Sequence, residues 1–225
     1  PLAGYGVPQL DDQTPMMRHR LAVFVARENV GKTRIMLHLA AALLRKGVKP
    51  FFACGETPKD SIFIDLVTTY IFQEYGMHFT SSDITEEGMQ MLTLEDQQLI
   101  TSVKARLISN GPYIVENLSY DNVTATMTKA YNEGCQAFFI DHTQSLRGRK
   151  GRSMNELVTN LALDCREFKN EYPVYVCVAS HPSTDLKDLM QKDKAKSLQI
   201  SPTAQSSTLS TEADEVFILY ENDLL

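Results

Sequence analysis

The sequence predicts an α/β protein with a mostly parallel, twisted sheet and helices on both of its faces. Short apolar runs alternate along the chain with longer segments of helical character, the order expected for parallel strands joined by crossover helices. The apolar runs are continuous rather than interleaved with polar residues, which indicates strands buried on both faces. The 225 residues are 43% hydrophobic and 22% charged, a composition typical of a soluble globular protein.

The first part of the chain supplies two strands and two helices. Residues 21–26 form a short apolar run that predicts a buried strand. Residues 32–46 place apolar side chains among good helix formers and predict a helix. Residues 50–54 predict a second strand, and residues 58–75 a second helix with Pro58 near its first position.

The remaining chain continues the alternation around two polar stretches. Residues 76–111 are polar and Met-rich, and Thr93 is the expected start of a helix within them. Residues 183–211 are rich in Ser, Thr and Lys and lack periodicity, so we expect no regular element there. The other expected elements are strands at 113–115, 137–140, 174–179 and 216–220 and helices at 121–133 and 153–170.

We expect residues 1–20 to form a lead-in segment and residues 21–225 to form one domain. The chain begins at Pro1 and stops at Leu225 directly after an apolar run, so we interpret it as an excised domain or a partial chain. No apolar run approaches the roughly 20 residues that span a bilayer, and no secretory signal opens the sequence. We therefore expect a cytoplasmic protein with no membrane partner.

Charge and cysteine usage exclude some classes of protein. The chain has 22 Lys and Arg against 28 Asp and Glu, a net charge of -6. This balance excludes a protein that coats nucleic acid or membranes by bulk charge, although a local basic site remains compatible with it. The four cysteines form no C-x-x-C pair and no histidine cluster lies beside them, so we expect no zinc site and buried, reduced thiols.

A phosphate-binding loop follows the first predicted strand. The sequence Ala26-Arg27-Glu28-Asn29-Val30-Gly31-Lys32-Thr33 matches the pattern G-x-x-x-x-G-K-[ST] except for Ala26 at its first position. In such a loop, backbone N–H groups surround phosphates at a helix N-terminus, the lysine reaches the β- and γ-phosphates, and the hydroxyl ligates Mg²⁺. The alternative is a chance loop capped by glycine. The expected nucleotide-binding residues are Ala26, Arg27, Glu28, Asn29, Val30, Gly31, Lys32, Thr33 and Arg34.

Two acids follow other predicted strands. Glu56 comes after the second strand and would orient and deprotonate an attacking water across the phosphates from Lys32. Its alternative role is to cap the helix that starts near Pro58. Asp141 follows four apolar residues, which is the Walker B pattern for an acid that supports Mg²⁺ together with Thr33, and its alternative is an ordinary strand-end carboxylate.

His181 follows the strand expected at 174–179, where a polar side chain would touch the γ-phosphate and report hydrolysis. A solvated loop histidine is the equally weighted alternative.

Two segments are candidates for contacts with nucleic-acid phosphates. Arg147, Arg149, Lys150 and Arg152 place four positive charges within six residues, which suits a phosphate backbone without base readout. The alternative is a solvated surface loop. In the later segment, Lys187, Lys192 and Lys194 are offset by nearby aspartates, so the electrostatic argument is weak there. No aromatic residues interleave with either cluster, which gives base stacking no support.

Five motifs follow one another along the chain: ARENVGKT before a helix, FFACGE, FFIDHTQSL, VYVCVASH and STEADEVFILY. This ordered set resembles the RecA-like motor domain of DnaB-type hexameric replicative DNA helicases, especially the phage branch. The opening GYGVPQLD also resembles the segment before the family's first strand, so the resemblance covers nearly the whole chain. It implies a RecA-like P-loop NTPase core that hydrolyses ATP, or another NTP, with Mg²⁺. The glutamate of FFACGE and the ending ADEVFILY are its more discriminating motifs.

The resemblance implies a hexameric ring of identical subunits that translocates on single-stranded DNA, unwinds a forked duplex, and pairs with a primase or helicase loader. It assigns Lys32 and Thr33 to phosphate and Mg²⁺, Glu56 to the catalytic base and Asp141 to the Walker B acid. His181 stands where the family usually has Gln. Segments 147–152 and 184–209 would line the channel, and the arginine finger is expected beyond Leu225. Two alternatives remain: a filament-forming recombination or repair ATPase, and a weakly hydrolysing regulatory or loader module.

Overall fold

The computed structural model describes residues 1–6, 8–12, 14–143, 146, 152–182 and 207–219. Six strands form one sheet in the order β3-β2-β4-β5-β1-β6, and each described pair is parallel. The predicted α/β class with a parallel sheet is confirmed. The strands are β1 (Arg20–Ala26), β2 (Lys49–Cys54), β3 (Tyr113–Glu116), β4 (Cys135–Asp141), β5 (Tyr175–Ser180) and β6 (Glu215–Leu219).

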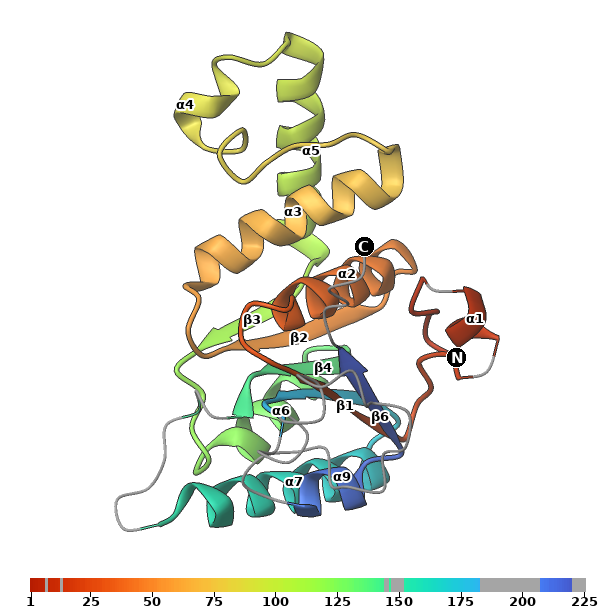
Figure 1. Cartoon of the computed structure of the whole chain (residues 1–225). Helices are drawn as coiled ribbons and strands as arrows, with labels where there is room; N and C mark the ends of the chain where they lie inside the picture. The colour runs from red at the N-terminus through yellow and green to blue at the C-terminus, as the bar shows by residue number, and fades with distance from the viewer. Residues whose placement is uncertain (7, 13, 144–145, 147–151, 183–206, 220–225) are drawn as a thin grey trace, which may run out of the picture.

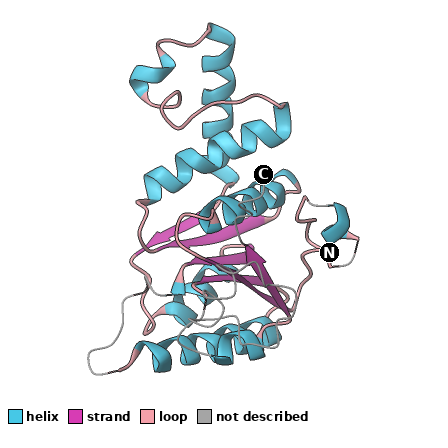
Figure 2. Ribbon diagram, viewed as in Figure 1, coloured by secondary structure: helices cyan, strands magenta, loops and turns pink. Residues whose placement is uncertain are grey.

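Helices cover both faces of the sheet (Figure 2). One apolar cluster joins the sheet to α2, α3 and α5, and a second joins its other face to α6, α7 and α9. Adjacent residues of one strand divide between these clusters: Phe52 enters the first and Phe51 the second. The helices are α1 (Pro8–Asp11), α2 (Lys32–Arg45), α3 (Lys59–Tyr75), α4 (Glu86–Met89), α5 (Leu94–Asn110), α6 (Val123–Asn132), α7 (Met154–Glu171) and α9 (Ser207–Glu212).

Local signals account for where the long helices begin and end. Thr93 caps α5 by accepting from the backbone N–H of Asp96. Ser153 and Glu156 form a reciprocal capping box at the start of α7. Gly76 ends α3 with a φ of 70°, a left-handed conformation that favours glycine.

Three short helices were not predicted, and one of them corrects an expectation. α9 begins within the stretch 183–211, for which the sequence predicted no regular element. Its six residues are too few to show periodicity, and Leu209 is fully buried in the second apolar cluster. Arg166 of α7 also donates to Glu212 at 2.6 Å. Tertiary packing therefore selects this helix. α1 and α4, with four residues each, are likewise too short for a periodic signal.

The lead-in segment packs on the domain beside β6. Ala3 and Met16 form an antiparallel bridge that closes a loop, and both are buried. The Tyr5 hydroxyl donates to Glu215 at 2.7 Å and lies 3.0 Å from the hydroxyl of Tyr175. Residues 2–16 are called the strap below.

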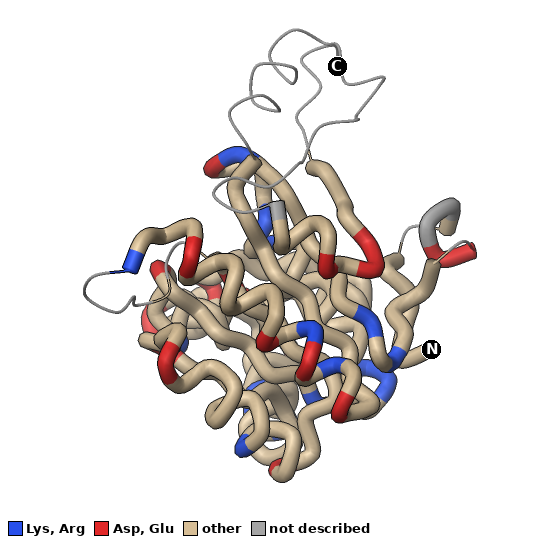
Figure 3. Tube along the Cα trace, turned by 90° about the horizontal axis from the view of Figure 1, so that it is seen from below, with Lys and Arg blue, Asp and Glu red and all other residues tan. Residues whose placement is uncertain are grey.

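The structure shows where the cysteines and the charged residues lie. All four cysteines are buried and free of disulfide bonds, as predicted. Basic and acidic residues are interspersed along the described trace in Figure 3. No helix within the described ranges is both long and apolar enough to cross a membrane.

Candidate nucleotide site

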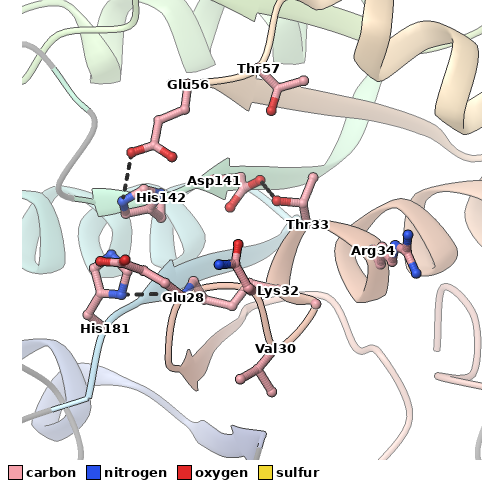
Figure 4. Close-up of a pocket in the computed structure, with 12 residues that line it drawn as sticks. Glu28, Val30, Lys32, Thr33, Arg34, Glu56, Thr57, Asp141, His142 and His181 are labelled. Atoms are coloured by element: carbon pink, nitrogen blue, oxygen red, sulfur yellow. Dashed lines mark hydrogen bonds and ion pairs between the residues drawn. The ribbon is translucent and has the colours of Figure 1, made fainter.

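Four strand ends meet at one edge of the sheet and form a cleft. The register pairs Cys54 with Asp141 and Val25 with Ser180, so the segments that follow β1, β2, β4 and β5 emerge side by side. Open parallel sheets bind ligands outside this edge. The cleft has a volume of about 750 Å³ and is shown in Figure 4. Its lining residues are Glu28, Asn29, Val30, Gly31, Lys32, Thr33, Arg34, Glu56, Thr57, Asp141, His142 and His181.

The loop between β1 and α2 has the conformation of a phosphate cradle. Asn29 has a φ of 62° and Gly31 a φ of 101°, which turn the chain back into the start of α2. A Cβ atom on Gly31 would meet nothing within 4 Å, so the backbone conformation, not crowding, favours glycine there. The first N–H groups of α2 and the positive end of its dipole face the cleft.

Lys32 lies inside this loop. Its ammonium donates to the carbonyls of Ala26 and Arg27, both at 2.9 Å, and lies 3.5 Å from Nδ1 of His181. Burial lowers the pKa of Lys32, while the carboxylates of Asp141 and Glu28 oppose that shift. The lysine is therefore a cation held by neutral carbonyls, which a phosphate oxygen can replace as a stronger acceptor.

Thr33 and Asp141 connect the loop to β4. The Thr33 hydroxyl donates to Oδ2 of Asp141 at 2.5 Å. Burial raises the pKa of Asp141, and the hydrogen bond from Thr33 acts in the opposite direction. The pair presents a hydroxyl and a carboxylate side by side to the cleft (Figure 4).

Glu56 extends from the segment after β2 and does not serve as the cap of α3. The backbone N–H of Lys59, the first residue of α3, donates to Glu116 at 2.6 Å. The backbone near Glu56 is fixed, because Gly55 donates to the carbonyl of Asp141 at 3.0 Å. The Glu56 side chain itself is 74% exposed and points across the cleft toward His142 in Figure 4.

Two histidines complete one wall, and only His181 was expected there from the sequence. The rings of His142 and His181 meet edge to face, with centroids 4.7 Å apart. Nε2 of His142 lies 3.7 Å from Oε1 of Glu56. Burial lowers the pKa of His142. The sequence feature that could have identified His142 is its position, because it directly follows Asp141 at the carboxyl end of a buried strand.

The remaining expected site residues fall into three groups. Glu28, Asn29, Val30 and Arg34 line the cleft, as expected for nucleotide-binding residues. Ala26 and Arg27 contribute the carbonyls that hold Lys32. Arg152 is exposed just before α7. Arg147, Arg149, Lys150, Lys187, Lys192 and Lys194 lie outside the described residues.

A second hollow of about 660 Å³ adjoins the phosphate loop. It shares Val30, Gly31 and Arg34 with the cleft. Its other walls come from the strap, from α2 and from β6, through Tyr5, Gly6, Ile35, His38, Ile218 and Leu219. The cleft is polar and the adjoining hollow is less polar, so together they could hold one elongated ligand.

Comparison with known proteins agrees with this geometry. The family model described as "DnaB-like helicase C terminal domain" matches residues 4–225. No curated protein matches the sequence. Among solved structures, the ATPase domain of a phage relative superposes with a TM-score of 0.78 and 19% identity, covering 98% of this chain and 76% of that one.

A second solved structure is described as "The Structure Of A DnaB-Like Replicative Helicase And Its Interactions With Primase". It matches with a TM-score of 0.77 and 19% identity over 98% of this chain. The present chain spans only 53% of that protein. At these identities the two structures support the RecA-like fold, while the family model covers nearly the whole sequence. The resemblance found in the motifs is therefore confirmed, and the chain belongs to the DnaB-like helicase C-terminal domain family, the ATPase domain of DnaB-like replicative helicases.

Proposed function

We propose that this domain is the motor of a ring-shaped helicase that couples ATP hydrolysis to movement along single-stranded DNA and to duplex unwinding. One observation carries the proposal: Lys32, Thr33, Glu56 and Asp141, from three different strand ends, line a single cleft. Phosphoryl transfer needs little covalent chemistry from a protein and depends on positioning and on stabilising charge. These four side chains supply both.

The phosphates of ATP would lie against the N-terminus of α2. Lys32 would exchange the carbonyls of Ala26 and Arg27 for β- and γ-phosphate oxygens, a short movement because both positions lie within the same loop. The base and ribose would extend into the adjoining hollow past Arg34. The phosphate end is the polar part of the site, and the hollow carries apolar walls from Ile35 and Leu219.

Thr33 and Asp141 fit a magnesium site. Mg²⁺ prefers hard oxygen ligands and keeps several of its waters, and this pair offers a hydroxyl and a carboxylate whose oxygens are 2.5 Å apart. Thr33 would be a direct ligand, and Asp141 would accept from the hydroxyl or from a bound water. When bound, the ion would neutralise charge on the β- and γ-phosphates.

Glu56 is the proposed general base. Its carboxylate would accept a proton from water while the water oxygen attacks the γ-phosphorus and the bond to the β-phosphate oxygen breaks. Support comes from its place opposite Lys32 and from the capping of α3 by Glu116, which leaves Glu56 available. His181, 3.5 Å from the Lys32 ammonium, would contact the γ-phosphate and report its loss.

Membership of the family suggests how the subunits assemble and which partners they bind. Six identical subunits would form the ring, with an arginine finger from a neighbour completing each site. Single-stranded DNA would contact Arg147, Arg149, Lys150 and Arg152, with Lys187, Lys192 and Lys194 on a second loop. The solved relative described with primase makes a primase a reasonable partner, and a loader another, in the cytoplasm of a bacterial or phage-infected cell.

The decisive test is hydrolysis by the Glu56→Gln variant of the full-length, assembled protein. Single-turnover ATP hydrolysis should fall by roughly 10²- to 10⁴-fold, the usual contribution of a general base, while ATP binding stays intact. Glu95→Gln, on the exposed side of α5, is the matched control and should hydrolyse normally. Equal rates for wild type and Glu56→Gln would remove the proposed base.

Assembly and unwinding test the rest of the proposal. Electron micrographs with an ATP analogue and single-stranded DNA should show rings, and the wild type should unwind a forked duplex. Filaments without unwinding would contradict the helicase assignment.

A further inference from the structure

The buried side chain of His142 lies beside the exposed side chain of Glu56. The side chain of His142 is 10% exposed, whereas that of Glu56 is 74% exposed. Nε2 of His142 and Oε1 of Glu56 are 3.7 Å apart, just beyond a direct hydrogen bond. A small rotation of the exposed carboxylate closes this gap, whereas the buried ring has little freedom to move. The geometry therefore makes His142 the reference point and Glu56 the group that is oriented.

The backbone around His142 is held from two sides. Gly55, next to Glu56, donates to the carbonyl of Asp141 at 3.0 Å. On the other side, the Tyr120 hydroxyl donates to the carbonyl of Thr143 at 2.6 Å. Both bonds link the end of β4 to separate segments of the chain. The position of His142 is thus set by the fold, which is what a positioning group requires.

The ring of His142 is held as well. It packs edge to face on His181, with an interplanar angle of 75°. His181 in turn lies 3.5 Å from the Lys32 ammonium. A continuous row of side chains therefore runs across the cleft from Lys32 through the two histidines to Glu56, and Figure 4 shows this order.

An exposed glutamate needs such support to act as a base. A free Glu side chain samples several rotamers, and holding it in one costs conformational entropy. A misplacement of about 1 Å at a reacting group can lower a rate by about 100-fold. The capping contact that would have fixed Glu56 is made by Glu116 instead.

We propose that His142 is a positioning residue that donates its Nε2–H to the Glu56 carboxylate and holds it toward the phosphates. The proposal rests on the function assigned to Glu56 above. His142 acts through Glu56 and takes no proton from water itself. Its contribution is to the rate of the chemical step, not to the affinity for nucleotide.

Two substitutions separate the donor from the ring. His142→Phe keeps an aromatic ring against His181 and removes the N–H donor. His142→Gln places an amide N–H close to the former Nε2 position. In the full-length assembled protein, the Phe variant should hydrolyse ATP roughly 10- to 100-fold more slowly in a single turnover, with an unchanged Kd for ATP. The Gln variant should recover most of that loss.

The matched control is His78→Phe. His78 lies in the exposed segment after α3, where its ring contacts Phe72 at a centroid distance of 4.3 Å. This variant makes the same chemical change away from the cleft and should hydrolyse ATP at the wild-type rate. A rate loss equal to that of His142→Phe would show a general effect of the substitution and overturn the proposal.

A double-mutant cycle with Glu56→Gln distinguishes the two proposals. If His142 acts through Glu56, adding His142→Phe to Glu56→Gln causes no further loss. A further loss of the same factor would show that His142 acts independently and would overturn the positioning role. A slow Glu56→Gln variant beside a fast His142→Phe variant would overturn this inference alone. A fast Glu56→Gln variant would overturn the proposed function.

A binding measurement identifies a merely structural effect. If His142→Phe raises the Kd for ATP as much as it lowers the rate, or if His142→Gln fails to restore the rate, the donor has no specific role. Either result would overturn the positioning proposal.

Discussion

Asp214 shows how one side chain joins three elements. Its Oδ2 atom accepts from Lys169 of α7 at 2.8 Å and from the backbone N–H of Leu21 in β1 at 2.7 Å. The N–H of Asp214 itself donates to the carbonyl of Leu21 at 2.8 Å. Lys169 is buried, so removing Asp214 would leave a buried ammonium without this ion-pair partner. The aspartate of the ADEVFILY motif therefore stabilises the entry to β6 and is remote from the chemistry.

Asp214→Asn is expected to lower stability in a pH-dependent way. Burial alone would raise the pKa of Asp214, but hydrogen bonds from Lys169 and Leu21 outweigh it and hold the pKa below its ordinary value of 3.8. The carboxylate thus contributes stability that is present above 3.8 and is lost as the pH falls through the lower folded-state pKa. At neutral pH the variant should lose about 1–3 kcal/mol.

Urea unfolding from neutral pH downward measures this difference. The gap between wild type and Asp214→Asn should shrink as the pH falls below the ordinary carboxyl range. Asp12→Asn, an exposed substitution in the strap, is the control and should change little at any pH. A gap that stays constant in acid would contradict the charge-based explanation.

The sequence indicated most of the site at this scale because its acids and phosphate loop directly follow apolar strands. Lys32, Thr33, Glu56 and Asp141 could be named in this way, and the structure brings all four to one cleft. The position of the His142 ring depends on the direction that its side chain takes after β4 ends. It also depends on the contact with His181, which follows a different strand, β5. Glu116 as the cap of α3 is also a tertiary contact, 57 residues away in sequence. Neither contact leaves a local pattern, although the position of His142 directly after Asp141 does indicate the cleft.

At the scale of elements, the strap and β6 stabilise each other. Tyr5 is buried and packs its ring against Phe217 of β6, with centroids 5.2 Å apart. Glu215 accepts from Tyr5 and from Thr14 through its two carboxylate oxygens. β6 is an edge strand paired only with β1 among the described strands. The strap thus covers an edge that would otherwise expose apolar surface.

Tyr5→Phe tests this arrangement because it keeps the ring and removes the hydroxyl. Tyr175 would lose a hydrogen-bonding partner at a buried position and Glu215 one at a partly buried position. Thermal or urea unfolding should show a loss of about 2 kcal/mol, and proteolysis within residues 1–16 should become faster. Tyr75→Phe, on the exposed end of α3, should leave both measurements unchanged. Wild-type stability of Tyr5→Phe would show that the hydroxyl network contributes nothing.

The elements that the sequence predicted are those with a long periodic or continuous apolar signal. The strand at 21–26 and the helix at 32–46 agree with β1 and α2 to within one residue at each end. The strand order β3-β2-β4-β5-β1-β6 was not predictable, since it depends on which strands pair after folding. α9 was missed for a related reason: among its described residues Leu209 is the one buried in the second apolar cluster, and one buried residue makes no period.

At the scale of the molecule, the net charge of -6 and a DNA-binding role are compatible. In a ring, positive charge is needed only on the loops that face the channel, and an acidic outer surface keeps the particle soluble. Arg152, the described member of the first basic cluster, is exposed just before α7. β4 ends at Asp141, the proposed Walker B acid, and this basic segment follows it in the sequence.

Replacing Arg147, Arg149, Lys150 and Arg152 with alanine should weaken single-stranded DNA binding and flatten its dependence on salt. Each lost phosphate contact lowers the slope of log K against log salt by roughly 0.7 for a single strand. Binding to several DNA sequences should weaken equally, because phosphate contacts carry no sequence information. The measurement is a salt titration of DNA affinity with the assembled protein and an ATP analogue.

The matched control removes the same charge from the opposite edge of the sheet. The four control residues lie on the side of the sheet where the parallel strands begin. Arg18 precedes β1, Lys46 precedes β2, Lys49 is the first residue of β2, and Lys129 lies in α6, which precedes β4. Alanine at these four positions changes the net charge equally. If bulk charge governs binding, both variants lose affinity alike and their salt slopes fall together. If the basic segment after β4 contacts the DNA, only its variant changes the slope, and an unchanged slope there would remove that segment from the DNA interface.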